Sequence, residues 1–349
     1  MASKEEMIKE LYHYFPNKAA AIIFAVLYIA SSILHEVQYN ATRPQKFTMP
    51  FILGTTFSGI GFVARSLSAL KVGDARTLWR ISSMFTLGAG PTYAGADYFV
   101  CGRIFSYVRS AAPISPLRTV RTFIVFDVLA EIAVWVGAGI MDGSGDPNSV
   151  RAKLGLNLLR AAVIIQLALF MCFVVVIFIF QIRATSRGFW KASHQKAGGT
   201  PGWVKVTYTL YASSLLIAVR SGYHIAENFL PSDHPFRATE APFLCLEALI
   251  MFINVAMFNV FHPGSLLPSN PHIYLLANGT EEKDDSSEGT LEDTRPLMMK
   301  IADPLDIKGL FNRKKTEKRY QEGASRGDDE MMPESVRMLE NRPRDGFHQ

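Results

Sequence analysis

The strongest constraint on this chain is a series of seven long apolar runs separated by short polar linkers. A helix that crosses a bilayer needs about 20 mostly apolar residues. A soluble helical core could bury one such segment, but seven at short intervals leave the bilayer as the only solvent that accommodates them. The runs cover residues 19–39, 50–70, 81–101, 121–141, 158–181, 205–230 and 240–261.

The charges divide the chain into two unlike parts. Residues 1–264 carry a net charge of +9 and residues 265–349 a net charge of −4, and every long apolar run precedes the acidic part. The expected fold class is all-α: a polytopic membrane protein with seven transmembrane helices and a disordered C-terminal tail. The expected domains are an N-terminal segment (1–18), the seven-helix transmembrane domain (19–264) and a disordered cytosolic tail (265–349).

Lys and Arg residues near a membrane stay preferentially in the cytosol and so set the orientation of the helices. The short loops barely discriminate between the two orientations, but the tail adds 13 Lys and Arg residues. We therefore expect the N-terminus outside and the C-terminus in the cytosol. The basic patch Asn312–Arg319 either touches anionic lipid or is a solvated charge cluster.

Polar side chains inside a span are costly, and they usually face the bundle interior or a water-filled cavity. Such residues cluster near the end of the sixth apolar run, and their spacing of i, i+3, i+4 and i+7 puts them on one helical face. They are Arg220, Tyr223, His224 and Glu227. The sequence therefore predicts a polar face on this helix.

Two acids in the last run are candidates for ion pairs with this polar face. Glu240 and Glu247 are seven residues apart and are expected to share one face of the neighbouring helix. With Arg65, which lies late in the second run, they predict an Arg–Glu network around an outward-facing cavity. Such a cavity could bind the amine or hydroxyl of an amphipathic lipid between apolar walls. Alternatively, the charges pair with one another and only hold the helices together.

A second polar group is expected nearer the cytosol. Asp127 and Glu131 are spaced i, i+4, and two neighbouring carboxylates often share a proton. With Asp97, they could form a polar relay for proton coupling. Salt bridges from Asp127 or Glu131 to Arg103 or Arg121 are the alternative.

The middle of the third run contains a proline between glycines. Pro91 lacks a backbone N–H, and Gly88, Gly90 and Gly95 lie on either side of it. This pattern predicts a kinked or loosened helix, which is either a hinge or a static bend.

Several classes of protein are excluded by missing residues. A retinal protein needs a Schiff-base Lys in its last helix, and the last run contains no Lys. A di-haem cytochrome needs four axial His residues on two helices, which the spans do not provide. A zinc hydrolase and an ATP-binding protein are excluded by the lack of an HExxH and a Walker-type motif. We therefore expect no enzymatic activity, no metal site and no cofactor. The basic residues lie between apolar segments, which argues against nucleic acid as a partner and leaves the bilayer and an amphipathic lipid.

Several short motifs along residues 12–264 occur in an order that is known from one family. They are Tyr14-Phe15-Pro16-Asn17-Lys18-Ala19-Ala20, Ile60-Gly61-Phe62-Val63-Ala64-Arg65, Gly102-Arg103, Ile217-Ala218-Val219-Arg220-Ser221-Gly222-Tyr223-His224 and Phe258-Asn259-Val260-Phe261-His262-Pro263-Gly264. Taken together, the chain resembles the fungal lipid-translocating exporter family, the RTA-like proteins linked to aminocholesterol resistance and sphingoid-base release.

This resemblance implies an integral protein of the plasma membrane that exports amphipathic lipids or lipid-like toxic compounds, sphingoid-base or sterol-like, and confers resistance. A receptor-like lipid or stress sensor without transport activity is the alternative. A translocator needs a polar route that links the outer group to Asp127 and Glu131. Ser58, His224 and Glu247 replace residues that are usual in the family (Glu, Arg and Asp), so the resemblance also implies a different choice of substrate.

Overall fold

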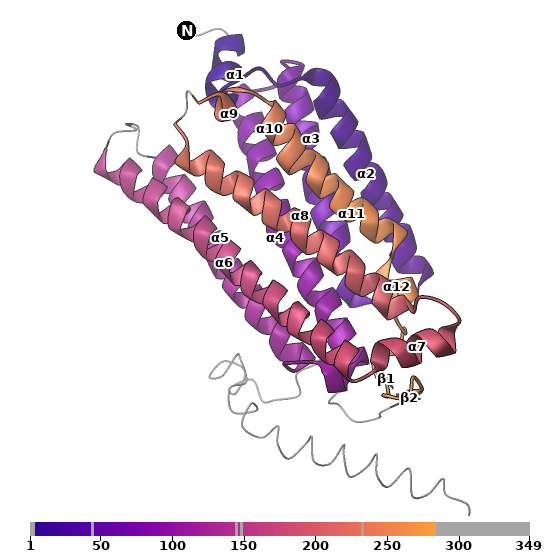
Figure 1. The fold of residues 1–349 in the computed structure, drawn as a ribbon. Helices are drawn as coiled ribbons and strands as arrows, with labels where there is room; N and C mark the ends of the chain where they lie inside the picture. The colour runs from indigo at the N-terminus through magenta and orange to yellow at the C-terminus, as the bar shows by residue number, and fades with distance from the viewer. Residues whose placement is uncertain (1–3, 43–44, 144–145, 147–148, 232–233, 284–349) are drawn as a thin grey trace, which may run out of the picture. The chain divides into compact units, whose positions relative to one another are not determined.

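The computed structural model describes residues 4–42, 45–143, 146, 149–231 and 234–283, all within one compact unit that spans residues 1–294. Most of these residues are helical, and the long helices run alongside one another (Figure 1). The helices are α1 Lys4–Tyr12, α2 Lys18–Ala41, η1 Lys46–Thr48, α3 Met49–Ala69, α4 Ala75–Tyr107, η2 Arg109–Ala111, α5 Pro116–Asp142, α6 Val150–Ser186, α7 Phe189–Ala197, α8 Gly202–Phe229, α9 Pro235–Ala238, α10 Ala241–Phe243, η3 Leu244–Leu249, α11 Ile250–Val260 and α12 Pro263–Leu266.

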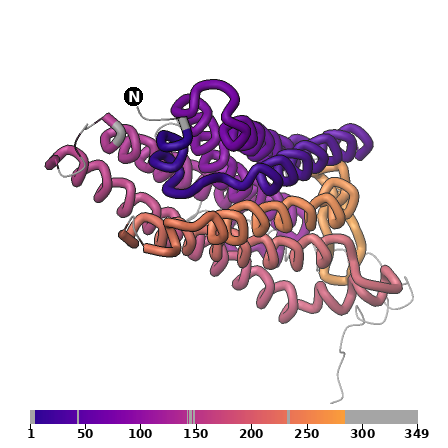
Figure 2. The backbone as a smooth tube through the Cα atoms, turned by 90° about the horizontal axis from the view of Figure 1, so that it is seen from above, coloured from indigo at the N-terminus to yellow at the C-terminus, as the bar shows by residue number. Residues whose placement is uncertain are grey.

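From α2 to α6, each long helix packs against the next one in the chain, and the later helices return to contact the earlier ones. α2 packs against α3, α3 against α4, α4 against α5, and α5 against α6. α8 contacts both α4 and α6, and α11 returns to lie beside α2 (Figures 1 and 2). The short helices α1 and α9 lie at one end of the bundle, and α7 lies at the other (Figure 1).

Five helical segments in the described part of the chain are long and apolar enough to cross a membrane. They are Lys18–Ala41, Lys46–Ala69, Pro116–Met141, Val150–Ser186 and Ala241–Leu266. The other two predicted spans, 81–101 and 205–230, lie within α4 and α8. These helices are long enough to cross a membrane, but they are less apolar than the five segments above. The reason is that α4 and α8 carry many of the buried polar residues of the bundle interior.

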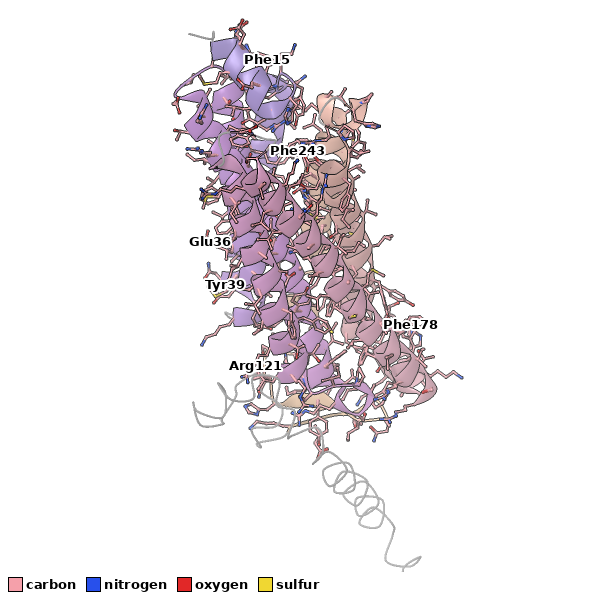
Figure 3. All side chains as sticks on the ribbon, turned by 90° about the vertical axis from the view of Figure 1, so that its left-hand side faces the viewer. Phe15, Glu36, Tyr39, Arg121, Phe178 and Phe243 are labelled. Carbon is pink, nitrogen blue, oxygen red and sulfur yellow. The ribbon has the colours of Figure 1, made fainter. Side chains whose placement is uncertain are left out.

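The outer surface of the bundle is apolar. On α2, Ile23 and Val26 are 56% and 60% exposed, and on α6 Phe178 is 58% exposed on the outside of the bundle (Figure 3). Soluble monomers rarely expose continuous apolar surface on this scale. The exposed apolar side chains therefore match hydrocarbon as the surrounding solvent.

Small residues allow two of the helices to approach closely. A Cβ on Gly137 of α5 would lie 2.8 Å from the carbonyl oxygen of Gly155 on α6, which is closer than side chains tolerate. Small residues at such crossings are typical of helix pairs in membranes, where backbone packing takes the place of hydrophobic burial. Further along the bundle, aromatic side chains fill the interior, with Tyr98 of α4 packed between Phe123 and Phe173.

Residues 265–283, which the sequence analysis assigns to the disordered tail, form ordered structure. Strands β1 (Ile273–Leu275) and β2 (Glu281–Lys283) pair antiparallel, with Tyr274 opposite Glu282. The end of α4 holds this segment, because Arg103 donates to the carbonyl of Asn270 at 2.8 Å and Tyr107 donates to Glu281 at 2.7 Å. The remainder of the predicted tail, from residue 284, lies outside the described residues.

Candidate functional site

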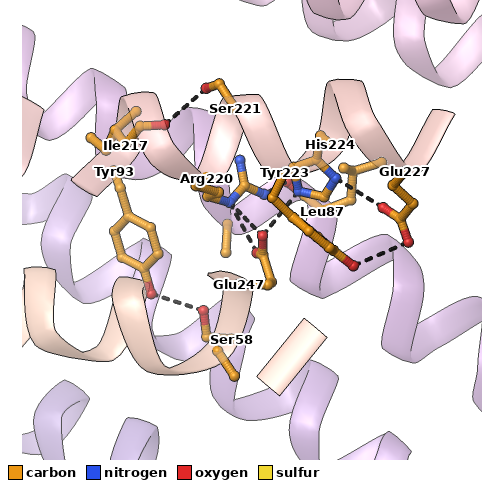
Figure 4. A network of polar contacts seen from close by, with 12 residues as sticks. Ser58, Leu87, Tyr93, Ile217, Arg220, Ser221, Tyr223, His224, Glu227 and Glu247 are labelled. Atoms are coloured by element: carbon orange, nitrogen blue, oxygen red, sulfur yellow. Dashed lines mark hydrogen bonds and ion pairs between the residues drawn. The ribbon is translucent and has the colours of Figure 1, made fainter. Parts of the chain in front are cut away.

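The most buried ion pair in the described bundle joins α8 to the last helical segment. The Nε of Arg220 lies 3.0 Å from Oε1 and 2.8 Å from Oε2 of Glu247 (Figure 4). The two side chains are only 8% and 4% exposed. Such a pair is stable only when its geometry satisfies both partners, because removing two charges from water is expensive.

His224 and Glu227 extend this pair along α8. Nε2 of His224 lies 2.9 Å from Oε2 of Glu247, and its Nδ1 lies 3.2 Å from Oε2 of Glu227 (Figure 4). The hydroxyl of Tyr223 donates to Oε1 of Glu227 at 3.1 Å. The four residues that the sequence places on one face of this helix thus form one chain of contacts with Glu247.

Helix α4 provides the space and one hydrogen-bond acceptor for the guanidinium of Arg220. A Cβ on Gly90 would overlap the guanidinium of Arg220, so any larger residue here would have to displace that group. Pro91 has no N–H to donate to the carbonyl of Leu87, four residues earlier, and Nη2 of Arg220 lies 3.5 Å from that carbonyl oxygen. Pro91 thus leaves a carbonyl oxygen near Arg220 without its helical donor, and α4 nevertheless continues to Tyr107.

A second buried pair lies at the end of the bundle that carries α1. Nη2 of Arg65 lies 2.8 Å from Oε1 of Glu240 and donates to the hydroxyl of Tyr14 at 2.9 Å. The backbone N–H of Asn17 donates to the other oxygen of Glu240 at 2.7 Å. The guanidinium also lies 4.1 Å from the ring centroid of Phe243, a cation–π contact. Burial raises the pKa of Tyr14, which therefore stays protonated.

In the structure the ion pairs of these residues form two clusters, where the sequence predicts one Arg–Glu network. Glu240 precedes α10 and contacts Arg65, whereas Glu247 lies in η3, a π-helical turn, and contacts Arg220. A π-helical turn holds more residues than an α-helical turn, so the two acids do not repeat on one face. Such turns are frequent at functional sites.

The first cluster lines a cavity of about 220 Å³. Its walls come from α4, α5, α6, α8, α10 and η3, and they combine apolar side chains with ionisable ones. The ionisable lining residues are Glu131, Arg220, Tyr223, His224, Glu227 and Glu247. Three carboxylates therefore face one guanidinium and one imidazole.

A second cavity, of about 280 Å³, lies beside the first and shares Tyr223, Glu227 and Phe243 with it. Arg65 lines this second cavity, together with the end of α1 and the residues that follow it. The N-terminal segment thus takes part in the polar region of the bundle. Charge and hydropathy alone assign residues 1–18 to a segment that flanks the first span, and the motif from Tyr14 to Asn17 is the signal that could have indicated its role.

The predicted relay residues divide between two places. Asp127 and Glu131 approach the same amide, since Nε2 of Gln166 lies 3.3 Å from Asp127 and 3.4 Å from Glu131. Asp97 is fully buried elsewhere and accepts from the hydroxyl of Ser213 at 2.9 and 2.7 Å. The alternative bridge to Arg103 does not form in the described residues, because that guanidinium donates to backbone carbonyls beyond α12.

Comparison with known proteins places the chain in a family. The family profile described as "RTA1 like protein" matches residues 51–270. A "lipid-translocating exporter-like protein RTA1" of Ajellomyces capsulatus is 51% identical over 79% of this chain and 86% of its own length.

Two more distant relatives have different names. A "probable lipid transporter atnI" of Emericella nidulans is 25% identical over 74% of this chain and 68% of its own length. A "protoporphyrin uptake protein 1" of Saccharomyces cerevisiae is 26% identical over 72% and 91%. No solved structure matches the chain. The match covers most of the helical region, and the chain is an integral membrane protein that belongs to the RTA1-like family of fungal proteins.

Proposed function

We propose that this protein is a seven-helix membrane translocator that exports amphipathic lipids or lipid-like toxic compounds and so confers resistance. It acts in the plasma membrane, with its N-terminus outside and its C-terminal tail in the cytosol. Relatives named as a lipid-translocating exporter-like protein and a probable lipid transporter support lipid transport as its role. The substrate is an amphipathic molecule with a cationic amine, of the sphingoid-base type.

The observation that carries this proposal is the excess of carboxylates around the first cavity. Glu247 neutralises Arg220, and His224 lies between Glu247 and Glu227. Nε2 of Gln166 lies 3.4 Å from Oε2 of Glu131, and the side chain of Trp135 lies near the same carboxylate. The buried Oε1 of Glu131 lacks a hydrogen-bond partner of good geometry among the described residues. An ammonium group supplies the donors that this carboxylate lacks, because an ionised carboxylate only accepts hydrogen bonds.

The walls of the same cavity suit the alkyl part of such a ligand. Val134, Leu159 and Val163 line it from α5 and α6. Pockets of this kind, apolar with a few convergent polar groups, are typical of sites for small amphipathic molecules. In the proposed site Arg220, Tyr223, His224, Glu227 and Glu247 contact the head group, while Arg65 and Glu240 position the neighbouring wall.

Binding to the purified protein in nanodiscs tests the proposal. Sphingosine is compared with N-acetylsphingosine, which keeps the chain and hydroxyls but lacks the charge. We expect sphingosine to bind about tenfold more tightly, a difference of about 1.4 kcal/mol. Glu131→Gln should remove this preference, whereas Glu36→Gln, a change at an exposed site on α2, should leave it intact. Equal affinity of the wild-type protein for both lipids would contradict the proposal.

Efflux from cells tests the same site in the membrane. Cells that express Arg220→Ala or Glu227→Ala should release sphingoid base more slowly than cells with the wild-type chain at equal surface level. Unchanged efflux and unchanged resistance in both variants would remove these residues from the site.

One observation favours a sensor as the second candidate function. In the described residues the hydrogen-bonded path from the first cavity ends at Asp127, and Tyr98, Phe123 and Phe173 pack beyond it. A sensor needs only the cavity, whereas a translocator must open this aromatic layer. Proteoliposomes with a fluorescent amine lipid distinguish the two: a translocator accelerates transfer between leaflets, and a sensor binds the lipid without accelerating its transfer.

A further inference from the structure

The second cavity is covered by the N-terminal segment. Tyr12, His13 and Tyr14 line it, and α1 is anchored beside it, because the side chain of Ile8 is completely buried and Glu5 forms an ion pair with Lys71 at the end of α3. The N-terminal segment thus gives the second cavity lining residues that the first cavity lacks.

Cationic groups characterise this second cavity. Arg65 and Arg237 both line it. Glu240 neutralises Arg65, but the half-buried guanidinium of Arg237 has no ion-pair partner among the described residues and donates to the backbone carbonyl of Leu230 at 3.0 Å. A guanidinium has five N–H donors, so Arg237 retains donors for a ligand.

Two further groups of the cover add hydrogen-bonding capacity. The buried hydroxyl of Tyr12 lies near the hydroxyls of Ser68 and Ser82, but it forms no hydrogen bond of good geometry in the part of the chain that the structure describes. His13 has a φ of 65°, in the left-handed region that residues other than glycine seldom adopt. Burial and the positive charge of Arg237 lower the pKa of His13, so its imidazole is neutral and offers one N–H. Strained residues of this kind cluster at ligand clamps.

The two cavities thus lie side by side with different electrostatic character. The first has an excess of carboxylates, and the second contains Arg237, a guanidinium without an ion-pair partner among the described residues. Glu227 lines both cavities, but His224 and Tyr223 contact its carboxylate. We propose, on the basis of the function proposed above, that the second cavity binds the anionic group of a zwitterionic lipid head group whose ammonium occupies the first. The ligand class is a single-chain lipid with phosphate and amine joined by a short linker.

The charges discriminate against simpler ligands. A lipid with only an amine leaves the remaining N–H donors of Arg237, beyond the one that contacts Leu230, without an acceptor, and unpaired buried donors are costly. A lipid with only a phosphate supplies no donor to the buried Oε1 of Glu131 in the first cavity, so that oxygen stays without a partner. A zwitterion satisfies both cavities at once.

Four probes with the full-length protein in nanodiscs test this assignment. They are oleoyl-lysophosphatidylethanolamine, oleylamine, oleoyl-lysophosphatidic acid and inorganic phosphate. We expect the zwitterion to bind about tenfold more tightly than oleylamine and more tightly still than lysophosphatidic acid. Inorganic phosphate should compete with the zwitterion and not with oleylamine.

Variants separate this proposal from the proposed function. Arg237→Gln should reduce the ratio of the two affinities, zwitterion over oleylamine, to about one, and Arg237→Lys should restore most of it. Glu131→Gln should weaken both ligands. Thermal unfolding of each variant in detergent establishes that it is folded.

Three results overturn the assignment, and they differ from a failure of the proposed function. The first is equal affinity for zwitterion and amine, the second is an unchanged ratio in Arg237→Gln, and the third is tightest binding of lysophosphatidic acid. In all three the site for the amine stands as long as oleylamine binding depends on Glu131. If neither oleylamine nor the zwitterion binds, the proposed function and the second site fail together.

Discussion

The guanidinium of Arg220 lies against the α-carbon of Gly90, in the space that any larger residue's Cβ would occupy. The next residue, Pro91, leaves the carbonyl of Leu87 without its helical donor, and Arg220 lies within reach of that oxygen. A glycine followed by a proline thus makes both the space and an acceptor for one buried cation. These contacts hold the Nη atoms of Arg220, while its Nε contacts Glu247.

Gly90→Ala should therefore displace the guanidinium from Glu247 and weaken amine binding about tenfold or more. The physical reason is steric, because the added methyl group overlaps Arg220 while leaving the charge on the protein. Gly95→Ala on the same helix is the matched control, since nothing lies within 4 Å of a Cβ there. Binding of sphingosine to nanodiscs measures both variants, and an equal effect of the two would contradict the role of Gly90.

Glu247→Gln should lower the free energy of unfolding by about 3–5 kcal/mol, because it leaves the buried Arg220 without its counter-charge. Glu247→Asp keeps the charge and should retain most of the stability. Unfolding in detergent, followed by temperature or denaturant, measures the loss. A Glu247→Gln protein as stable as an exposed control such as Glu36→Gln would show that the pair contributes nothing.

Tyr14→Phe should loosen the N-terminal segment without unfolding the bundle. The change removes the hydrogen bond with Arg65, which contributes about 1 kcal/mol, and keeps the aromatic ring beside the guanidinium. Hydrogen exchange of residues 4–17 should become faster, by about fivefold for a loss of about 1 kcal/mol. Tyr208→Phe, at an exposed tyrosine on α8, is the control. Unchanged exchange would mean that Tyr14 does not hold the cover.

Arg103→Met should release the segment with β1 and β2 while leaving the cavities intact. The variant keeps apolar bulk at the end of α4 but removes the donors to the carbonyls beyond α12, and each buried carbonyl left unpaired costs about 1–3 kcal/mol. Limited proteolysis should cut residues 267–283 faster than in Arg151→Met, an exposed control on α6. Sphingosine affinity is expected to stay constant, since Arg103 lines neither cavity.

Much of the local chemistry of the site is visible in the sequence. The spacing of Arg220, Tyr223, His224 and Glu227 predicts one helical face, and the structure joins them in one chain of contacts. The family is predicted as well, and the comparisons confirm it. Both follow from short-range regularities, namely the helical period and motifs within one helix.

The partners of the charged residues could not be predicted in the same way. The sequence groups Asp97 with Asp127 and Glu131 as one relay. In the structure Asp97 instead accepts a hydrogen bond from Ser213, which is 116 residues away in the chain. Glu240 and Glu247 belong to different clusters because a π-helical turn at Leu244–Leu249 changes the register. No periodicity in a single helix specifies such a turn.

The sequence by itself determined that this chain is a membrane protein, that it belongs to the RTA1-like family, and which polar residues share the face on α8. Only the tertiary structure decided that Arg220 pairs with Glu247, that Arg65 pairs with Glu240, and that the N-terminal segment covers a second cavity. The physical reason is that lipid and the protein interior are equally apolar, so hydrophobic patterning leaves the helix neighbours open. Packing of small residues and pairing of buried charges across helices determine which helices become neighbours.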